Sequence, residues 1–416
     1  MEFLNATWDA RAFQSKVRDR SYWLRVLLLI VLGMVVARWL ETLDWWRAAT
    51  YRTYGALLRI SQSPPEYPSW TAVVLIDDED YWRGAWARRS PIKRSTLATL
   101  IEQINRASPR VIAIDIDLRA HVPDGSILTH PDYDRETKYL FGVIARVAQT
   151  TPIVLPKTVG FDERARSFVV DADLFDQVPL GQKVAAGYTR VPADLRNLAL
   201  PTTVNGQRIK SLAAAAAAFV EPESVAVAQR RGGDELPFSM FLPEAAYARV
   251  TVRARDVLAG DAAALRALQH RVVVVGGQWH REAYGRGPLV DHHLTPVGLL
   301  PGAIIHANYI EALLAQRSFS PSFHWVHYGL DVLVGVALAV IFVAVRGPWK
   351  VLYIVVLALV VAVISVAAFQ NLGTFFDGVP ALVLLGCHAA VETMTEWKRA
   401  YDEHEHCPSR KLEATE

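Results

Sequence analysis

The sequence contains little cysteine: only Cys387, inside an apolar stretch, and Cys407, near the end of the chain, among 416 residues. Neither lies in the large middle segment, so the fold of that segment cannot depend on a disulfide. A sizeable domain without disulfides is more typical of a bacterial periplasm than of the outside of an animal cell.

An excess of charge of one sign is also missing. The chain has 44 Lys and Arg against 42 Asp and Glu, a formal net charge of +2, which gives no reason to expect nucleic acid as a partner. No Ser, Cys or Thr stands in a nucleophile-elbow sequence, and there is no phosphate-binding loop. We therefore expect no cofactor, and catalysis is not the favoured function.

Long apolar stretches occur only towards the two ends of the chain. The first is followed by Arg38, Trp39 and Leu40, where a cleaved signal peptide would need small residues, so it is expected to remain as an anchor. In the last stretch, Asp377 and Glu392 shorten the apolar core towards a re-entrant length, whereas Lys398 and Arg399 after it favour a full crossing. The four stretches are residues 22–40, 324–345, 351–369 and 375–394.

Basic residues flank these stretches alternately. Arg18 and Arg20 precede the first, Arg346 lies between the second and third, and Lys398 and Arg399 follow the fourth. The positive-inside rule then places both chain ends in the cytoplasm, with a large outer domain. The predicted order is cytoplasmic N-terminus 1–21, span 22–40, extracytoplasmic domain 41–323, spans 324–345, 351–369 and 375–394, and cytoplasmic tail 395–416. The predicted location is the bacterial inner membrane.

The middle segment has the pattern of an α/β fold. Residues 71–77 form a buried strand, Ser90 and Pro91 open a helix, and residues 110–117 form a second strand, which together make a βαβ unit with a parallel pair. Further predicted elements are helices 134–148, 212–220, 261–268 and 301–314 and strands 152–155, 247–252 and 271–277. The sequence therefore predicts an α/β extracytoplasmic domain with a mainly parallel sheet, joined to a membrane region of four transmembrane helices.

Polar or glycine residues follow three of the predicted strands. In parallel α/β sheets, ligands bind beyond the carboxyl ends of the strands. The loop 291–296 leads into the closing helix and adds histidine and threonine. The candidate ligand-binding residues are Asp77, Asp78, Asp115, Asp117, Gly276, Gly277, His292 and Thr295.

Two interpretations of these residues stay open. Asp115 and Asp117 alternate onto one face of their strand, so an acidic pocket could bind a hard cation or a cationic or polyhydroxylated ligand. Alternatively, the acids cap the following helices and pair with nearby arginines. His292 and His293 lack the spacing of a zinc site, so no metal is predicted. His306 is expected to be a core histidine.

Asp331 lies inside the second apolar stretch. An ionisable residue at that depth should face other helices or water, which makes it a candidate for helix assembly or signal transfer.

Between the flanking apolar stretches, the chain contains the motifs VVLIDDED, RVIAIDID and TPVGLLPGAIIHANYIEALL, in that order. Together they resemble the CHASE type-two family of bacterial extracellular sensory domains. Members are usually joined to adenylate cyclases, histidine kinases or diguanylate cyclases. Here only residues 395–416 follow the fourth stretch, so the resemblance implies sensing with output through a separate effector of the cyclase or kinase class.

The favoured hypothesis is therefore a membrane receptor whose outer domain binds an unknown extracytoplasmic ligand, with a homo-oligomer possible. A second hypothesis is a structural or assembly subunit that uses the outer domain for protein–protein contact. A third is a metal-dependent surface hydrolase.

Overall fold

The structure is a computed structural model of the chain. It describes residues 18–40, 42–61, 67–118, 132–162, 167–170, 181–191, 197–204, 207–232, 235–237, 241–283, 285–317, 324–345 and 349–372, with the single residues 14, 175, 195 and 401. The chain divides into two compact units, residues 51–321 and residues 1–50 with 322–416, and each is described by itself.

The larger unit is built on a six-stranded parallel sheet with the order β11-β1-β12-β2-β3-β6. β1 and β12 each bury six consecutive residues, because both faces of these central strands are covered. The sheet strands are β1 (Thr71–Asp77), β2 (Val111–Asp115), β3 (Ile153–Lys157), β6 (Val184–Tyr188), β11 (Thr251–Arg253) and β12 (Val272–Gln278).

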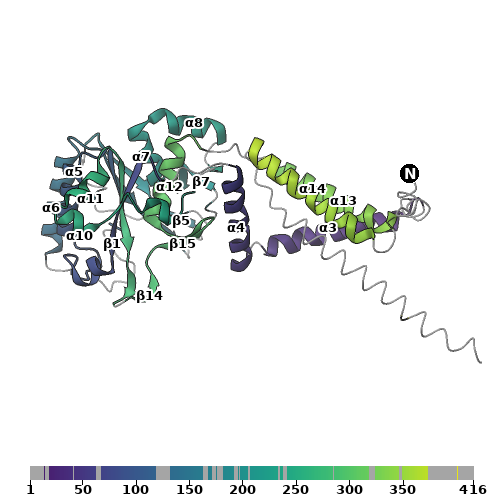
Figure 1. Ribbon diagram of the computed structural model, residues 1–416. Coiled ribbons are helices and arrows are strands. Elements are labelled where there is room, and N and C mark those ends of the chain that lie inside the picture. The colour runs from purple at the N-terminus through teal and green to yellow at the C-terminus, as the bar shows by residue number, and fades with distance from the viewer. Residues whose placement is uncertain are drawn as a thin grey trace, which may run out of the picture. The chain divides into compact units, whose positions relative to one another are not determined.

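Helices cover both faces of the sheet and make a three-layer sandwich (Figure 1). One face packs against α5 (Arg94–Arg106), α6 (Tyr133–Val147), α10 (Ala254–Leu258) and α11 (Ala262–Leu268). The other packs against α7 (Leu212–Val220) and α12 (Gly302–Leu314). The alanine run of α7 allows this close packing.

The remaining elements of this unit are short. The other helices are η1 (Glu79–Arg83), α8 (Pro222–Gly232) and α9 (Glu244–Tyr247). The two-stranded sheets are β4 (Val159–Asp162) with β5 (Ser167–Val170), β7 (Asn197–Ala199) with β10 (Glu235–Pro237), β8 (Pro201–Val204) with β9 (Gln207–Lys210), β13 (His280–Glu282) with β14 (Arg286–Leu289), and β15 (His292–Thr295) with β16 (Gly298–Pro301).

The chain changes face at β12. After β1 and β2 it continues into α5 and α6 on one face, whereas after β12 it passes through two hairpins into α12 on the other face. Because β12 lies between β1 and β2, the chain departs to opposite faces from neighbouring strands. In open α/β sheets, ligands commonly bind beyond the carboxyl ends of the strands at such a switch point.

All thirteen residues of α12 are buried, including His306, Asn308 and Glu311. Asn308 fixes the preceding chain by accepting a hydrogen bond from Leu242 N (2.7 Å) and donating one to Leu242 O (3.1 Å). Its amide therefore pairs with Leu242 as a neighbouring strand would.

The smaller unit contains α3 (Arg20–Leu40), α13 (His324–Ala344) and α14 (Trp349–Leu372), and α4 (Asp44–Ser61) begins in it. Val26 and Ile30 of α3 pack against Ala339 of α13. Val334 and Leu338, also on α13, pack against α14.

Three of the four predicted spans coincide with α3, α13 and α14, and the fourth, residues 375–394, lies outside the described residues. Within the described part of the chain, one stretch, Leu352–Phe369, is long and apolar enough to cross a membrane. Val332–Ile341 is apolar but shorter. The four-helix membrane region thus stays a prediction.

The α/β prediction is confirmed, and several element boundaries need correction. β1 and α7 have the predicted bounds. β2 ends at Asp115, so Asp117 lies beyond the strand and the two do not share a strand face. The helix expected after Ser90 begins at Arg94.

Two further segments differ from the prediction. The strand expected over residues 247–252 is shorter, because Tyr247 ends the short helix α9 and β11 begins at Thr251. The loop expected over residues 291–296 is largely the strand β15 of a hairpin, paired with β16.

Candidate functional site

At the carboxyl end of β2, beside β12, Asp115 lies close to α12. Asp115 is the last residue of β2 and lies opposite Gly276 of β12. A Cβ atom on Gly276 would lie 2.6 Å from the Cβ of Ala303, so only glycine allows α12 to approach the sheet this closely. Asp115 is therefore covered from the side of α12.

The side chain of Asp115 is only 7% exposed, and its Oδ2 atom has no hydrogen-bond partner within the described part of the chain. Its Oδ1 atom lies 3.7 Å from Nε2 of His306. Burial raises the pKa of Asp115 well above its usual value, and the neighbouring carboxylate of Asp291 raises it further. Relative to an exposed aspartate, this shift favours the protonated form, which can donate a hydrogen bond.

His306, on α12, is 2% exposed, and burial lowers its pKa. Its Nε2 atom lies 3.0 Å from the carbonyl oxygen of Thr189. Because a carbonyl can only accept, the proton belongs on Nε2, and Nδ1 of the neutral ring carries a lone pair. That Nδ1 atom is buried, and no described residue forms a hydrogen bond with it.

Asp291 lies where β15 and α12 meet. A Cβ atom on Gly302, the first residue of α12, would lie 1.9 Å from Oδ2 of Asp291, so the carboxylate rests against the start of the helix. The positive end of the helix dipole favours a negative charge there. Oδ1 of Asp291 is 2.9 Å from Nε2 of His293.

We call Asp115, Asp291, His293 and His306 the acid–histidine cluster. It combines a buried acid with a raised pKa, an imidazole lone pair and a carboxylate paired with a second histidine. These groups can donate hydrogen bonds to a polar ligand and accept hydrogen bonds from a polar or cationic ligand. Among the described residues, no group of three or more His, Cys, Asp and Glu side chains is arranged to hold a metal ion.

The acids after β1 form a different, internally paired set. Asp77 accepts hydrogen bonds from Nη1 of Arg255 (2.9 and 3.1 Å) and from Asp80 N (2.9 Å). Asp78 accepts one from His280 N (2.8 Å) and lies 2.6 Å from His280 Nδ1. Burial raises the pKa of Asp80 to about 6. This arrangement matches the alternative in which acids support local structure and pair with arginine.

The other predicted site residues hold turns and close contacts. Gly277 lies under the ring of Trp279, which a Cβ atom would approach to 2.2 Å. Nδ1 of His292 is 3.0 Å from Val290 O, and the hydroxyl of Thr295 donates to Gly298 O at 2.6 Å.

The structure thus connects only part of the predicted set. No hydrogen bond or ion pair between described residues joins Asp77, Asp78, His292 or Thr295 to Asp115. Asp117 is exposed. Asp331 falls within α13, but the surroundings of its side chain lie outside the description.

Asp291, His293 and His306 were not among the predicted ligand-binding residues, although Asp291 and His293 lie in the loop 291–296 that was named beside them. His306 has the burial expected of a core histidine, yet it belongs to the cluster. The spacing between Asp291 and the Pro301-Gly302 helix start is the sequence signal that could have found Asp291, since glycine at that position leaves room for a side chain.

Neither a curated protein nor a solved structure matches the chain. A family model, the CHASE2 domain, matches residues 26–345, from within α3 to the residue after α13. CHASE2 domains are extracellular sensory domains. The match covers more than half of the sequence, and the chain belongs to the CHASE2 domain family.

Proposed function

We propose that this protein is a multi-pass membrane receptor of the bacterial inner membrane. Its CHASE2 domain lies in the periplasm and binds a polar or cationic ligand at the acid–histidine cluster, and its termini lie in the cytoplasm. A separate effector of the cyclase or kinase class reads the bound state. The observation that carries the proposal is the CHASE2 match, which includes helices on both sides of the sensory domain.

The packing of α3 on α13 supports this topology. The hydroxyl of Tyr22 donates to Ala339 O at 2.9 Å, and a Cβ atom on Gly335 would lie 2.7 Å from Ile30. Residues later in α3 thus contact residues earlier in α13, so the two helices run antiparallel. The end of α3 and the start of α13 lie at one end of the pair, as a domain outside the membrane requires.

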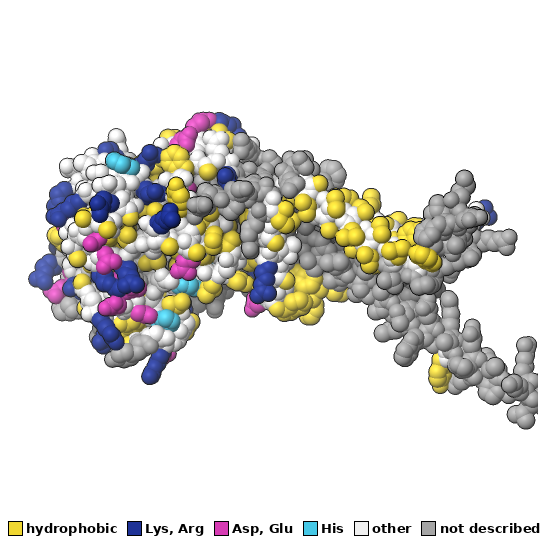
Figure 2. All heavy atoms as spheres, in the orientation of Figure 1, with side chains coloured by type: hydrophobic (Ala, Val, Ile, Leu, Met, Phe, Trp, Pro, Cys, Tyr) yellow, Lys and Arg dark blue, Asp and Glu magenta, His cyan; other side chains and the backbone are white. Residues whose placement is uncertain are grey.

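The outer surfaces of these helices are apolar. Leu28 of α3 is 63% exposed and Val363 of α14 is 67% exposed, and hydrophobic side chains cover the visible side of α13 and α14 (Figure 2). Leaving a leucine or valine side chain in water costs about 1.5–3 kcal/mol relative to burial. A continuous apolar surface of this kind suits contact with lipid.

A structural route leads from the cluster towards α4. His293 lies on β15, and the turn that ends β15 contains Pro296. A Cβ atom on Gly55 of α4 would lie 2.1 Å from Pro296 O, so the turn and the helix backbone are in direct contact. A ligand that binds one arrangement of the hairpin more tightly would favour the position of α4 that goes with that arrangement. The equilibrium between the two positions would change by the difference in the ligand's binding free energy for the two arrangements.

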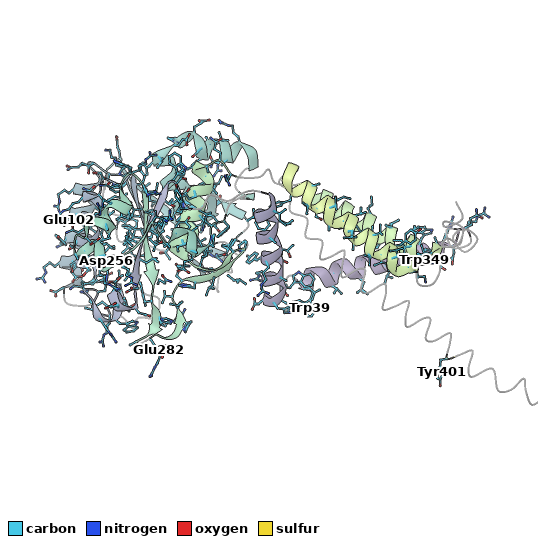
Figure 3. The ribbon with its side chains drawn as sticks, viewed as in Figure 1. Trp39, Glu102, Asp256, Glu282, Trp349 and Tyr401 are labelled. Atoms are coloured by element: carbon cyan, nitrogen blue, oxygen red, sulfur yellow. The ribbon has the colours of Figure 1, made fainter. Side chains whose placement is uncertain are left out.

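The topology is tested by labelling single cysteines in spheroplasts, with Cys387 and Cys407 replaced by serine. Glu282 on β13 is exposed and carries the outer reporter, Glu282→Cys (Figure 3). Tyr401→Cys carries the inner one. A membrane-impermeant maleimide should label Glu282→Cys in intact spheroplasts and Tyr401→Cys only after lysis. The reverse pattern would contradict the proposal.

The route is tested by amide hydrogen exchange on the purified full chain. Asp115→Asn changes the cluster without touching α4, and exchange in residues 51–61 should change with it. Asp256→Asn, a substitution in α10 outside the cluster, serves as control. Unchanged exchange in residues 51–61 of the Asp115→Asn variant would exclude the route.

A further inference from the structure

A second buried charge lies at the carboxyl edge of the sheet, on the face opposite the acid–histidine cluster. Arg94, the first residue of α5, is 1% exposed. Its Nη1 atom donates to the hydroxyl of Thr137, and its guanidinium carbon lies 3.6 Å from the ring centroid of Tyr133. The guanidinium is therefore held in one orientation by two residues of α6.

Two of its nitrogens, Nε and Nη2, are buried and have no hydrogen-bond partner among the residues that the structure describes. The N–H groups of these two atoms point in parallel from one edge of the guanidinium plane, which is the edge that binds a carboxylate or phosphate with two hydrogen bonds. A buried guanidinium with this edge empty is costly, because each unpaired donor has lost its water.

The carboxylate nearest to Arg94 is already engaged. Oε1 of Glu136 lies 2.6 Å from Nη1 of Arg89, and Oε2 accepts the backbone N–H of Arg94 (3.1 Å) and of Ser95 (3.4 Å). Asp134 and Asp117 interact with Arg94 only through their charge, and both are exposed. Burial lowers the pKa of Arg94 to about 9 in spite of these three acids, so its charge is not fully compensated.

The backbone adds to the attraction for an anion. α5 has 13 residues and α6 has 15, and both helices begin at this edge, since each follows a parallel strand that ends there. A helix N-terminus carries a partial positive charge and is a common site for phosphate and carboxylate. Two such ends and a buried arginine lie together.

We propose that Arg94 binds an oxyanion, a carboxylate or a phosphate-like group, through its Nε and Nη2 atoms between the starts of α5 and α6. The site is distinct from the acid–histidine cluster and does not depend on it. Arg89 is the adjacent second cation, and Tyr133 and Thr137 hold the Arg94 guanidinium in place.

The test measures the thermal unfolding midpoint of the purified full chain in sodium acetate, phosphate and sulfate against sodium chloride, at equal pH and ionic strength. Acetate represents the carboxylate class, and phosphate and sulfate represent the tetrahedral class. At least one should raise the midpoint in a saturable way, by about 5–10 °C at one hundred times the dissociation constant. If none raises it relative to chloride, the proposal is wrong.

Arg94→Met separates an anion site from a structural arginine. The substitution removes the uncompensated charge and keeps an apolar stem, so in chloride the midpoint should rise by about 2–4 °C. The stabilisation by the oxyanion should disappear. An oxyanion shift equal to that of the wild type would overturn the proposal.

Two further variants complete the test. Arg94→Lys keeps the charge but loses the two-pronged edge, so the half-saturating anion concentration should rise by about 10–100-fold. Arg106→Met is the matched control, because Arg106 is exposed in the last turn of the same helix and, among the described residues, forms a side-chain hydrogen bond with Gln103. If Arg106→Met abolishes the shift as Arg94→Met does, the effect is not due to the Arg94 site.

Discussion

At the amino edge of the six-stranded sheet, the buried carboxylate of Glu311 is fully used. Its Oε1 atom accepts hydrogen bonds from Trp70 N (2.7 Å), Thr71 N (2.6 Å) and the Thr71 hydroxyl (2.9 Å). At the carboxyl edge, the side chains of Asp115 and His306 are buried to a similar degree. Among the described residues, however, neither Oδ2 of Asp115 nor Nδ1 of His306 has a hydrogen-bond partner.

This contrast separates buried polar groups that stabilise the fold through hydrogen bonds from open groups, which are buried polar groups whose hydrogen-bonding atoms the fold leaves unpaired. A buried polar atom without a partner costs about 1–3 kcal/mol. At the amino edge, the hydrogen bonds between α12 and the start of β1 avoid that cost. At the carboxyl edge, where parallel sheets bind ligands, the unpaired atoms lower the stability of the fold. The open groups are therefore the better candidates for binding, and the satisfied ones for stability.

The largest expected effect is at the amino edge. Glu311→Ala leaves the N–H groups at the start of β1 without an acceptor, and we expect it to lower the free energy of unfolding by about 3–5 kcal/mol. Denaturant unfolding of the full chain measures this change. Glu102→Ala is the control: Glu102 pairs with Arg146 at the surface, and its loss should cost less than about 1 kcal/mol. Equal effects would remove the contrast.

At the carboxyl edge, Asp115→Asn should change how stability depends on pH. The folded state raises the pKa of Asp115 above its usual 3.8, so above that pH the folded state binds more protons than the unfolded state. The free energy of unfolding then falls by about 1.4 kcal/mol per pH unit until the pH passes the folded pKa. Asparagine resembles the protonated acid and removes this loss.

The measurement is the free energy of unfolding of both proteins from pH 4 to pH 9. The variant should match the wild type near pH 4 and become the more stable protein as the pH rises. All other ionisable groups are the same in both proteins, so their contributions largely cancel in the difference. Parallel curves over the whole range would show that Asp115 is ionised in the folded state.

A smaller effect is expected at the start of α12. Gly302→Ala places a Cβ atom 1.9 Å from Oδ2 of Asp291, so the helix start or the carboxylate must move, at a cost of about 1–3 kcal/mol. Gly142→Ala is the matched control, because Gly142 lies inside α6 with nothing within 4 Å of its missing Cβ. It should instead stabilise the protein by about 0.5–1 kcal/mol. Thermal melts of the two variants compare the sites.

Sequence patterns predicted the elements whose signals are local. The bounds of β1 and α7 follow from uninterrupted apolar runs, and Asp115 was found because it ends such a run. The β15–β16 hairpin was missed, because the Thr295-Pro296 dipeptide reads as a loop and the flanking strands have only four residues each.

The partners of buried charges could not be predicted in the same way. Glu311 binds the backbone of residues 69–71, some 240 positions away, and Glu136 binds the start of α5, 42 positions away. Periodicity shows that such residues lie on a helix but not which backbone groups lie opposite. Which acids are satisfied and which remain open is decided by tertiary packing alone.

The smallest expected effect concerns Asp77, which lies at the carboxyl edge but is paired in the manner of the amino edge. Its carboxylate is 27% exposed and binds Arg255, so Asp77→Asn should cost about 0.5–1 kcal/mol and less in high salt. Urea unfolding at low and high ionic strength measures it. If Asp77 instead belongs with the open groups, Asp77→Asn should raise the free energy of unfolding, as Asp115→Asn is expected to do. In that case the division between satisfied and open acids would no longer separate stability from binding.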